Sequence, residues 1–162
     1  MLDWTSTTTH NLLIDGHFIP AASGRVFDSL NPATGEVLAQ VAEAGAEDVN
    51  AAVRSCRKAL EGAWGALRAA ERGALLLKLA DLIRRDTEEL VHLESLDSGK
   101  PVSAIRRQHL PAVIDTLTYY AGMADKINGQ VIPTRPDALT YTTREPVGVV
   151  AAIVPWNFPL MI

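Results

Sequence analysis

Residues Glu145 to Pro159 read EPVGVVAAIVPWNFP, an apolar run that leads into two prolines enclosing a tryptophan and an asparagine. Val147 to Val154 is apolar throughout, so both faces of a strand built from it would be apolar, and we expect a buried parallel strand. In open α/β sheets, ligands bind beyond the carboxyl ends of the strands, which makes Asn157 a candidate site residue. The prolines limit backbone freedom there, and a fixed carboxamide N–H can stabilise a developing oxyanion. Taken alone, the turn also fits a packed corner without a chemical role.

The composition is typical of one globular unit, because 162 residues with 48% apolar and 21% charged side chains can build a core. The net charge of −4 and the absence of long basic runs argue against nucleic acid as a partner. The longest apolar run is too short to cross a bilayer, and the start has no signal-like pattern, so we expect no membrane partner. With Cys56 as the single cysteine, a reducing, cytoplasmic location fits best.

Two small β units precede a helical block. Asp15–Gly16 predicts a tight hairpin turn, because this pair tolerates positive φ angles. Asn31 to Gly35 predicts a second turn, in which Pro32 fixes φ and Gly35 permits the reversal. Apolar spacing of three and four residues then predicts helices. The expected helices cover residues 47–61, 71–85, 87–96 (or a continuous helix with the one before) and 111–126, with a capping box from Asp86 to Glu89 and a stop at 97–101.

After the predicted helices, the sequence pattern changes from helical to β-forming. Residues 130–132 and 139–144 are rich in β-forming side chains and predict an exposed β ribbon. A single buried parallel strand at 147–154 needs neighbours that the chain does not obviously supply. The sequence therefore predicts an α/β domain of which only part is present.

Several side chains are of types that often act in catalysis or metal binding, but a structural role explains each of them more simply. Cys56 lies on the apolar stripe of its helix, so we expect it to be buried and inert. The four histidines match no zinc spacing and are expected at the surface or partly packed, and no metal site is predicted. The core is expected to take the aromatic and apolar residues Trp64, Tyr119 and Tyr120, Leu75, Leu79, Leu82 and Ile83, and Val113, Leu117 and Ala124.

Six motifs in sequence order resemble the NAD(P)-dependent aldehyde dehydrogenase family, in its N-terminal portion. They are Leu13 to Gly16, Asn31 to Glu36, Leu93 to Pro101, Tyr119 to Gly122, Arg144 to Gly148, and Pro155 to Pro159. The resemblance covers most of the chain.

The resemblance implies how the chain is divided. Residues 1–128 would be the N-terminal part of an incomplete Rossmann-like cofactor-binding domain. Residues 129–145 would be a β ribbon for oligomerisation, giving a dimer or tetramer. Residues 146–162 would begin the parallel nucleotide-binding sheet.

The resemblance also implies a reaction, the oxidation of an aldehyde to a carboxylic acid with NAD or NADP through a cysteine thiohemiacetal and thioester. Asn157 would help hold the oxyanion, and the cofactor cleft would be lined by Ile153, Val154, Pro155 and Trp156. No Gly-x-Gly-x-x-Gly motif occurs, so the dinucleotide rests on the resemblance alone.

The family's cysteine nucleophile and general-base glutamate lie downstream of Ile162, so these residues by themselves are predicted to be inactive. The alternative is a short noncatalytic interaction module that pairs through the edge of its β ribbon. Some family members hold a monovalent cation with the aspartate equivalent to Asp97 and a carbonyl near Ser29. A helix-terminal aspartate before a glycine turn is the simpler explanation of Asp97.

Overall fold

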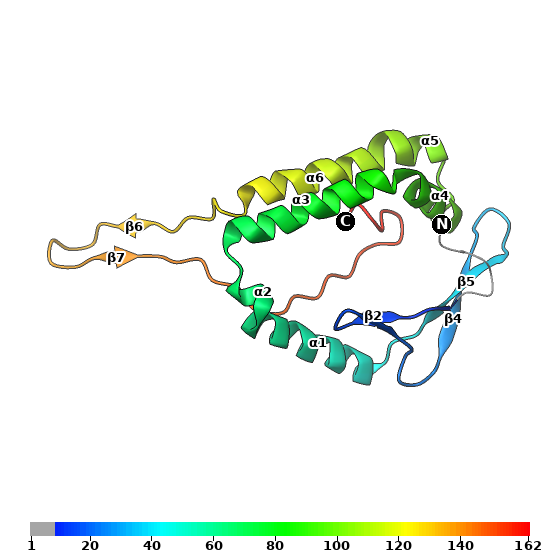
Figure 1. The fold of residues 1–162 in the computed structure, drawn as a ribbon, viewed down its shortest axis with the longest axis horizontal. Helices are drawn as coiled ribbons and strands as arrows, with labels where there is room; N and C mark the ends of the chain where they lie inside the picture. Colours follow the sequence, from blue (N-terminus) through cyan, green and yellow to red (C-terminus); the bar gives the residue numbers. More distant parts are fainter. Residues whose placement is uncertain (1–8) are drawn as a thin grey trace.

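In the computed structural model, which describes residues 9–162, helices and short strands are arranged around the segment that follows β7 (Figure 1). In that view, residues after β7 run back between α1 and the paired helices α3 and α6, while the β6–β7 ribbon projects away from the helices. The elements are β1 Thr9–His10, β2 Leu12–Ile14, β3 His17–Ile19, β4 Val26–Leu30, β5 Val37–Ala42, α1 Ala46–Glu61, α2 Ala63–Ala66, α3 Ala69–Arg85, α4 Thr87–Ser98, α5 Val102–Ala104, the π-helix η1 Ile105–His109, α6 Leu110–Met123, β6 Val131–Ile132 and β7 Thr140–Tyr141.

Both predicted β turns are confirmed. Asp15 and Gly16 have φ angles of 53° and 78°, the left-handed pair that a two-residue hairpin needs, and they join antiparallel β2 and β3. The second turn is closed by Asn31, whose carbonyl accepts the N–H of Gly35 at 2.7 Å and whose side chain accepts that of Ala33 at 2.9 Å. It joins β4 to β5 in a sheet with the order β1-β5-β4.

Asp48 fastens the start of α1 to the β units. Its buried carboxylate accepts the backbone N–H of Gly45 at 2.8 Å and that of Ala22 at 2.9 Å. These hydrogen bonds favour the charged form, first the one from Gly45 and then the one from Ala22, and they hold the pKa of Asp48 below its usual value. The acidic first turn predicted from the sequence therefore carries a capping interaction as well as a favourable charge.

The core lies where α3, α4, η1 and α6 meet. Its buried members are Ile83, Val91, Ile105, Leu110 and Val113. Helices α3 and α6 lie side by side (Figure 1) and approach closely at Gly73, where an added Cβ would lie 2.7 Å from the carbonyl oxygen of Ala121. Small residues at this crossing bring the two backbones together.

The sequence predicts a separate helix near Pro111, and the structure corrects this. The chain is helical without a break from Val102 to Met123, and the five residues before α6 form the π-helix η1. The N–H of Leu110 bonds to the carbonyl of Ile105, five residues back. Proline in an α-helix clashes with the carbonyl four residues earlier, and the wider π turn lets Pro111 enter the first turn of α6.

The helix break at Asp86 is confirmed, but its capping box is not formed. The Asp86 carboxylate instead accepts two hydrogen bonds from the guanidinium of Arg85, each 2.7 Å long. The stop after α4 is confirmed, since Gly99 has a φ of 72°.

Several predicted core residues are exposed, and those predictions are wrong. Tyr120 is 60% exposed, Trp64, Tyr119, Leu75, Leu79 and Leu82 also face outward, and Cys56 is exposed rather than buried. Only one side of α3 is packed against α6, so its apolar stripe is wider than the surface that covers it. Ile83 and Val113 are buried as predicted, and the small residues Ala80 and Ala121 are buried as well.

The buried parallel strand predicted at 147–154 is also wrong. No strand forms there, and Val147 and Ile153 are 92% and 99% exposed. A parallel strand exists only by hydrogen bonding to a neighbour, and no strand within residues 9–162 pairs with this segment. The β ribbon, in contrast, forms as predicted, with Val131 opposite Tyr141 and Ile132 opposite Thr140. No helix of residues 9–162 has the length and apolar character needed to cross a bilayer.

Replacing Gly73 by Ala is expected to lower the free energy of unfolding by about 1–3 kcal/mol, because the new methyl group meets the α6 backbone. Gly122→Ala is the matched control, since Gly122 is also helical but has open space around its Cβ position. That change should raise stability by about 0.5–1 kcal/mol through helix propensity. Urea unfolding of the two variants measures both effects. Equal shifts of the same sign would contradict the close approach.

Candidate functional site

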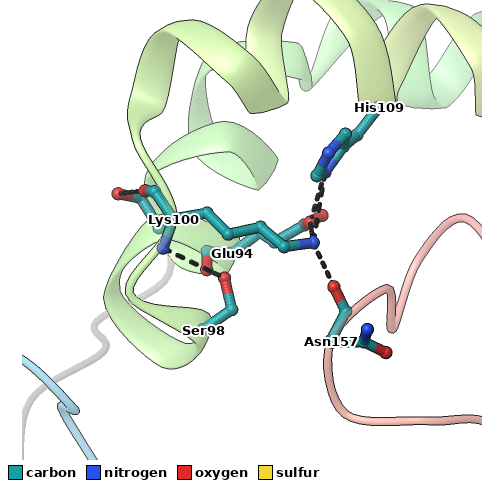
Figure 2. Close-up of polar contacts among 6 residues, drawn as sticks. Glu94, Ser98, Lys100, His109 and Asn157 are labelled. Atoms are coloured by element: carbon teal, nitrogen blue, oxygen red, sulfur yellow. Dashed lines mark hydrogen bonds and ion pairs between the residues drawn. The ribbon is translucent and has the colours of Figure 1, made fainter.

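The turn from Pro155 to Pro159 contains the predicted site residue Asn157. Leu160 and Met161, directly after the turn, pack against the core. The carboxamide of Asn157 is exposed and makes no hydrogen bond with another residue of the described chain, while its backbone carbonyl accepts a hydrogen bond from the ammonium of Lys100 (Figure 2). The side chain is therefore available to a ligand while the backbone is held.

Three charged or polar side chains meet behind this turn, and we call Glu94, Lys100 and His109 the Lys100 cluster. Figure 2 shows the ammonium of Lys100 between the carboxylate of Glu94 and the carbonyl of Asn157, with His109 on the other side of that carboxylate. Lys100 Nζ lies 3.3 Å from Glu94 Oε1 and 3.4 Å from His109 Nδ1, and His109 Nδ1 lies 2.9 Å from the same carboxylate oxygen. The side chains of Glu94, His109 and Lys100 are only 5%, 10% and 20% exposed. The cluster is thus a largely buried polar network.

The hydrogen-bond inventory assigns the proton on His109. A carboxylate only accepts, so the short contact with Glu94 places the hydrogen on Nδ1 of His109. That nitrogen then cannot accept from Lys100, whose 3.4 Å contact with it is long. The ammonium is instead directed to the Glu94 carboxylate, to the carbonyl of Asn157 and to the ring of Phe158, whose centroid lies 3.7 Å from Nζ.

The local sequence explains how Lys100 reaches Glu94 across the end of α4. Gly99 takes the left-handed conformation, and an added Cβ there would lie 2.9 Å from Cγ of Pro32. The hydroxyl of Ser95 then donates to the carbonyl of Lys100 at 2.7 Å and ties the reversed chain to the helix. The π-helix η1 brings His109 to the other side of Glu94.

The sequence alone did not predict this cluster. His109 was expected at the surface or partly packed, and it is buried. Glu94 and Lys100 belong to one of the six family motifs, but nothing in their spacing indicates that a histidine from the next helical segment joins them. The only signal along the chain is the glycine stop between Glu94 and Lys100, which allows the chain to fold back.

The four residues predicted to line a cofactor cleft lie on the open segment before Asn157. Ile153, Val154 and Trp156 are exposed and Pro155 is half-buried. The backbone groups of residues 147–154 make no hydrogen bond within residues 9–162. An apolar surface with free backbone donors and acceptors fits the planar rings and polar edges of a dinucleotide.

Asp97 lies at the end of α4 beside a second feature, an apolar cavity of about 420 Å³ between the β1-β5-β4 sheet and α4. The hydroxyl of Ser29 donates to the Asp97 carboxylate at 2.7 Å. Within residues 9–162, no group of three or more His, Cys, Asp or Glu side chains is arranged to hold a metal ion. The Ser29 contact gives Asp97 a structural role in joining β4 to α4.

Comparison with known proteins identifies the class of protein. The model of the aldehyde dehydrogenase family matches residues 18–162. The chain is 50% identical over 149 residues to aminoacetaldehyde dehydrogenase of Pseudomonas aeruginosa, covering 91% of this chain and 30% of that protein. It is 46% identical over 151 residues to the mitochondrial benzaldehyde dehydrogenase of Antirrhinum majus, covering 93% of this chain and 28% of that protein.

A solved structure agrees with these matches. The NAD+ complex of an aldehyde dehydrogenase from Bacillus cereus superimposes with a TM-score of 0.92 at 48% identity, over 94% of this chain and 31% of that chain. The chain belongs to the aldehyde dehydrogenase family, as the motifs predicted. It spans about three tenths of the length of these relatives.

Replacing Glu94 by Gln is expected to lower the free energy of unfolding by about 2 kcal/mol, because it leaves the Lys100 ammonium without its charged partner in a buried site. Glu88→Gln, on the same helix, is the matched control. The pair of Glu88 with Arg106 is exposed, so its loss should change stability much less. Thermal or urea unfolding compares the two variants. Equal losses of unfolding free energy would show that the ion pair in the Lys100 cluster stabilises the protein no more than an exposed one.

Proposed function

We propose that these residues form the N-terminal portion of an NAD(P)-dependent aldehyde dehydrogenase that oxidises an aldehyde to a carboxylic acid. The observation that carries the proposal is the state of Asn157, whose side-chain amide is free while its backbone is held by a buried polar network. Membership of the family supports the same reaction class.

Asn157 would act as an oxyanion donor. When a thiolate attacks an aldehyde, the carbonyl oxygen gains negative charge, and a carboxamide N–H directed at it lowers the energy of that state. The benefit depends on the donor being in place before the charge develops, since a donor that must first be ordered loses part of its effect. The prolines at 155 and 159 and the contact from Lys100 restrict the backbone that carries the carboxamide, which reduces the ordering that is still needed.

Ile153, Val154, Pro155 and Trp156 would hold the dinucleotide, NAD or NADP, through apolar contact and free backbone groups. The bound dinucleotide would accept the hydride from the substrate carbon. Solved relatives include complexes with NAD+, which supports this cofactor class. The described residues contribute the surface and the oxyanion donor. Without a cysteine nucleophile and general base placed at this site, residues 1–162 alone are expected not to turn over aldehyde.

We further propose that the domain organisation follows the division implied by the family motifs, with residues 1–128 in the cofactor-binding domain, 129–145 in an oligomerisation ribbon, and 146–162 starting the parallel sheet. The ribbon supports self-association through its apolar face. Val131 pairs with Tyr141, Leu139 lies on the same face two residues earlier, and all three are exposed. A second copy of the chain is the proposed partner.

Asn157→Ala in the natural protein that carries these residues is expected to lower kcat for aldehyde oxidation about 100- to 1000-fold, because one oxyanion donor is lost. The KM for NAD+ should change little, since the backbone that faces the cofactor is kept. Steady-state NADH formation measures both constants. Asn50→Ala, at an exposed position of α1, is the control and should match the parent. A fully active Asn157→Ala variant would contradict the proposed role of Asn157 as an oxyanion donor.

Leu139→Asp is expected to shift the protein to a smaller oligomer, because a charge on the apolar face of the ribbon opposes its burial between two copies. Leu13→Asp is the matched control, at an exposed leucine of β2. Sedimentation equilibrium gives the mass of each variant. An unchanged mass for Leu139→Asp would contradict pairing through this face.

A further inference from the structure

We propose that Lys100, held in place by Glu94 and His109, is a positioning residue that restrains the backbone of Asn157 and so the place from which its carboxamide extends. The inference rests on the proposed function for its catalytic consequence. The structural claim, that the Lys100 cluster orders the turn, does not depend on the proposed function.

The first support is that Lys100 binds the turn at two consecutive residues. Its ammonium donates to the carbonyl of Asn157 and lies over the ring of Phe158, 3.7 Å from the centroid. His109 contacts the same ring from a second direction, with centroids 4.9 Å apart and planes inclined at 54°. Two members of the Lys100 cluster therefore hold both the peptide that follows Asn157 and the next side chain.

The second support is that the turn has few other constraints. Within residues 9–162, the bond from Lys100 to Asn157 is the only hydrogen bond that joins residues 146–162 to an earlier part of the chain. Leu160 and Met161 anchor the segment by apolar packing, but they lie after the turn. Apolar contact is non-directional, so it does not set the orientation of a peptide three residues away. The N–H of Ile162 donates to the carbonyl of Phe158 at 3.1 Å within the segment, and Lys100 supplies the directional contact from an earlier part of the described chain.

The third support is the charge balance of the cluster. A buried ammonium is costly unless it is paired, and Glu94 supplies the compensating charge. His109 donates to the same carboxylate at 2.9 Å and so limits the positions that the Glu94 carboxylate can take. Lys100 bonds to this restrained carboxylate and directs its remaining N–H groups toward Asn157 and Phe158.

The consequence for catalysis follows from the backbone link. Lys100 contacts the carbonyl of Asn157 and not its carboxamide, so it does not face the reacting atoms. The contact holds the plane of the peptide that follows Asn157. It thereby restricts the ψ angle of Asn157, and with it the positions that Cβ and the carboxamide can reach. Because a displacement of about 1 Å at a catalytic group costs on the order of 100-fold in rate, loss of this link should reduce kcat rather than substrate affinity.

The structural claim is tested without activity, by hydrogen–deuterium exchange with mass spectrometry on peptides covering residues 154–162. Lys100→Met should increase deuterium uptake at Ile162, whose N–H donates to the carbonyl of Phe158 at 3.1 Å and closes the turn, because the contact that orders the turn is gone. Lys78→Met, at an exposed position of α3, is the matched control and should leave the uptake unchanged. Equal uptake in the parent and in Lys100→Met overturns the inference, even if the variant is less stable elsewhere.

The catalytic claim is tested by a double-mutant cycle in the natural protein. Lys100→Met should lower kcat about 10- to 100-fold with little change in the aldehyde KM, and Lys100→Arg should restore part of it because a charged donor is kept. In the Asn157→Ala background, Lys100→Met should have almost no further effect, since it acts through Asn157.

The outcomes separate the two proposals. Additive losses in the cycle, or a parental kcat in Lys100→Met with a slow Asn157→Ala, overturn the positioning role and leave the proposed function standing. A parent without aldehyde oxidation, or an unaffected Asn157→Ala, overturns the proposed function, and the exchange experiment still decides whether the Lys100 cluster orders the turn.

Discussion

The largely buried ion pair between Lys100 and Glu94 is the constraint on which the candidate site depends. Taking these charges out of water is favourable only when each has close partners, and the partners here come from three parts of the chain, namely α4, η1 and the turn around Asn157. The apolar core beneath, built on Ile105 and Leu110, fixes the helices that carry Glu94 and His109. A stable core thus supports a polar network, and the network orients an otherwise lightly held turn.

The rest of the molecule is open by comparison. Large apolar side chains on α3, on the ribbon and along residues 147–154 face solvent, and such surface is normally covered by other elements or by a partner. This agrees with the finding that the chain corresponds to about three tenths of the length of its relatives. The same exposure leaves the predicted cofactor-lining residues with free backbone groups, so the openness and the proposed binding role have one physical origin.

Local signals in the sequence predicted the local structure well. The hairpin at Asp15–Gly16 and the helix stop at Gly99 follow from backbone preferences of single residues, and the structure confirms them. The ribbon follows from short runs of β-forming side chains and is also confirmed. The predictions that depended on distant partners were wrong. The strand at 147–154 lacks a neighbour, Tyr120 and Trp64 lack a covering element, and Pro111 entered a continuous helix because a π turn absorbed its steric conflict.

By itself, the sequence determined the family, the α/β character and the position of Asn157 between two prolines, since motifs and turn residues act over a few positions. Only the tertiary structure decided that Glu94, Lys100 and His109 meet behind that asparagine. Such a meeting is set by the path of the helices and by the cost of burying charge without a partner, and neither is visible in residue spacing along the chain.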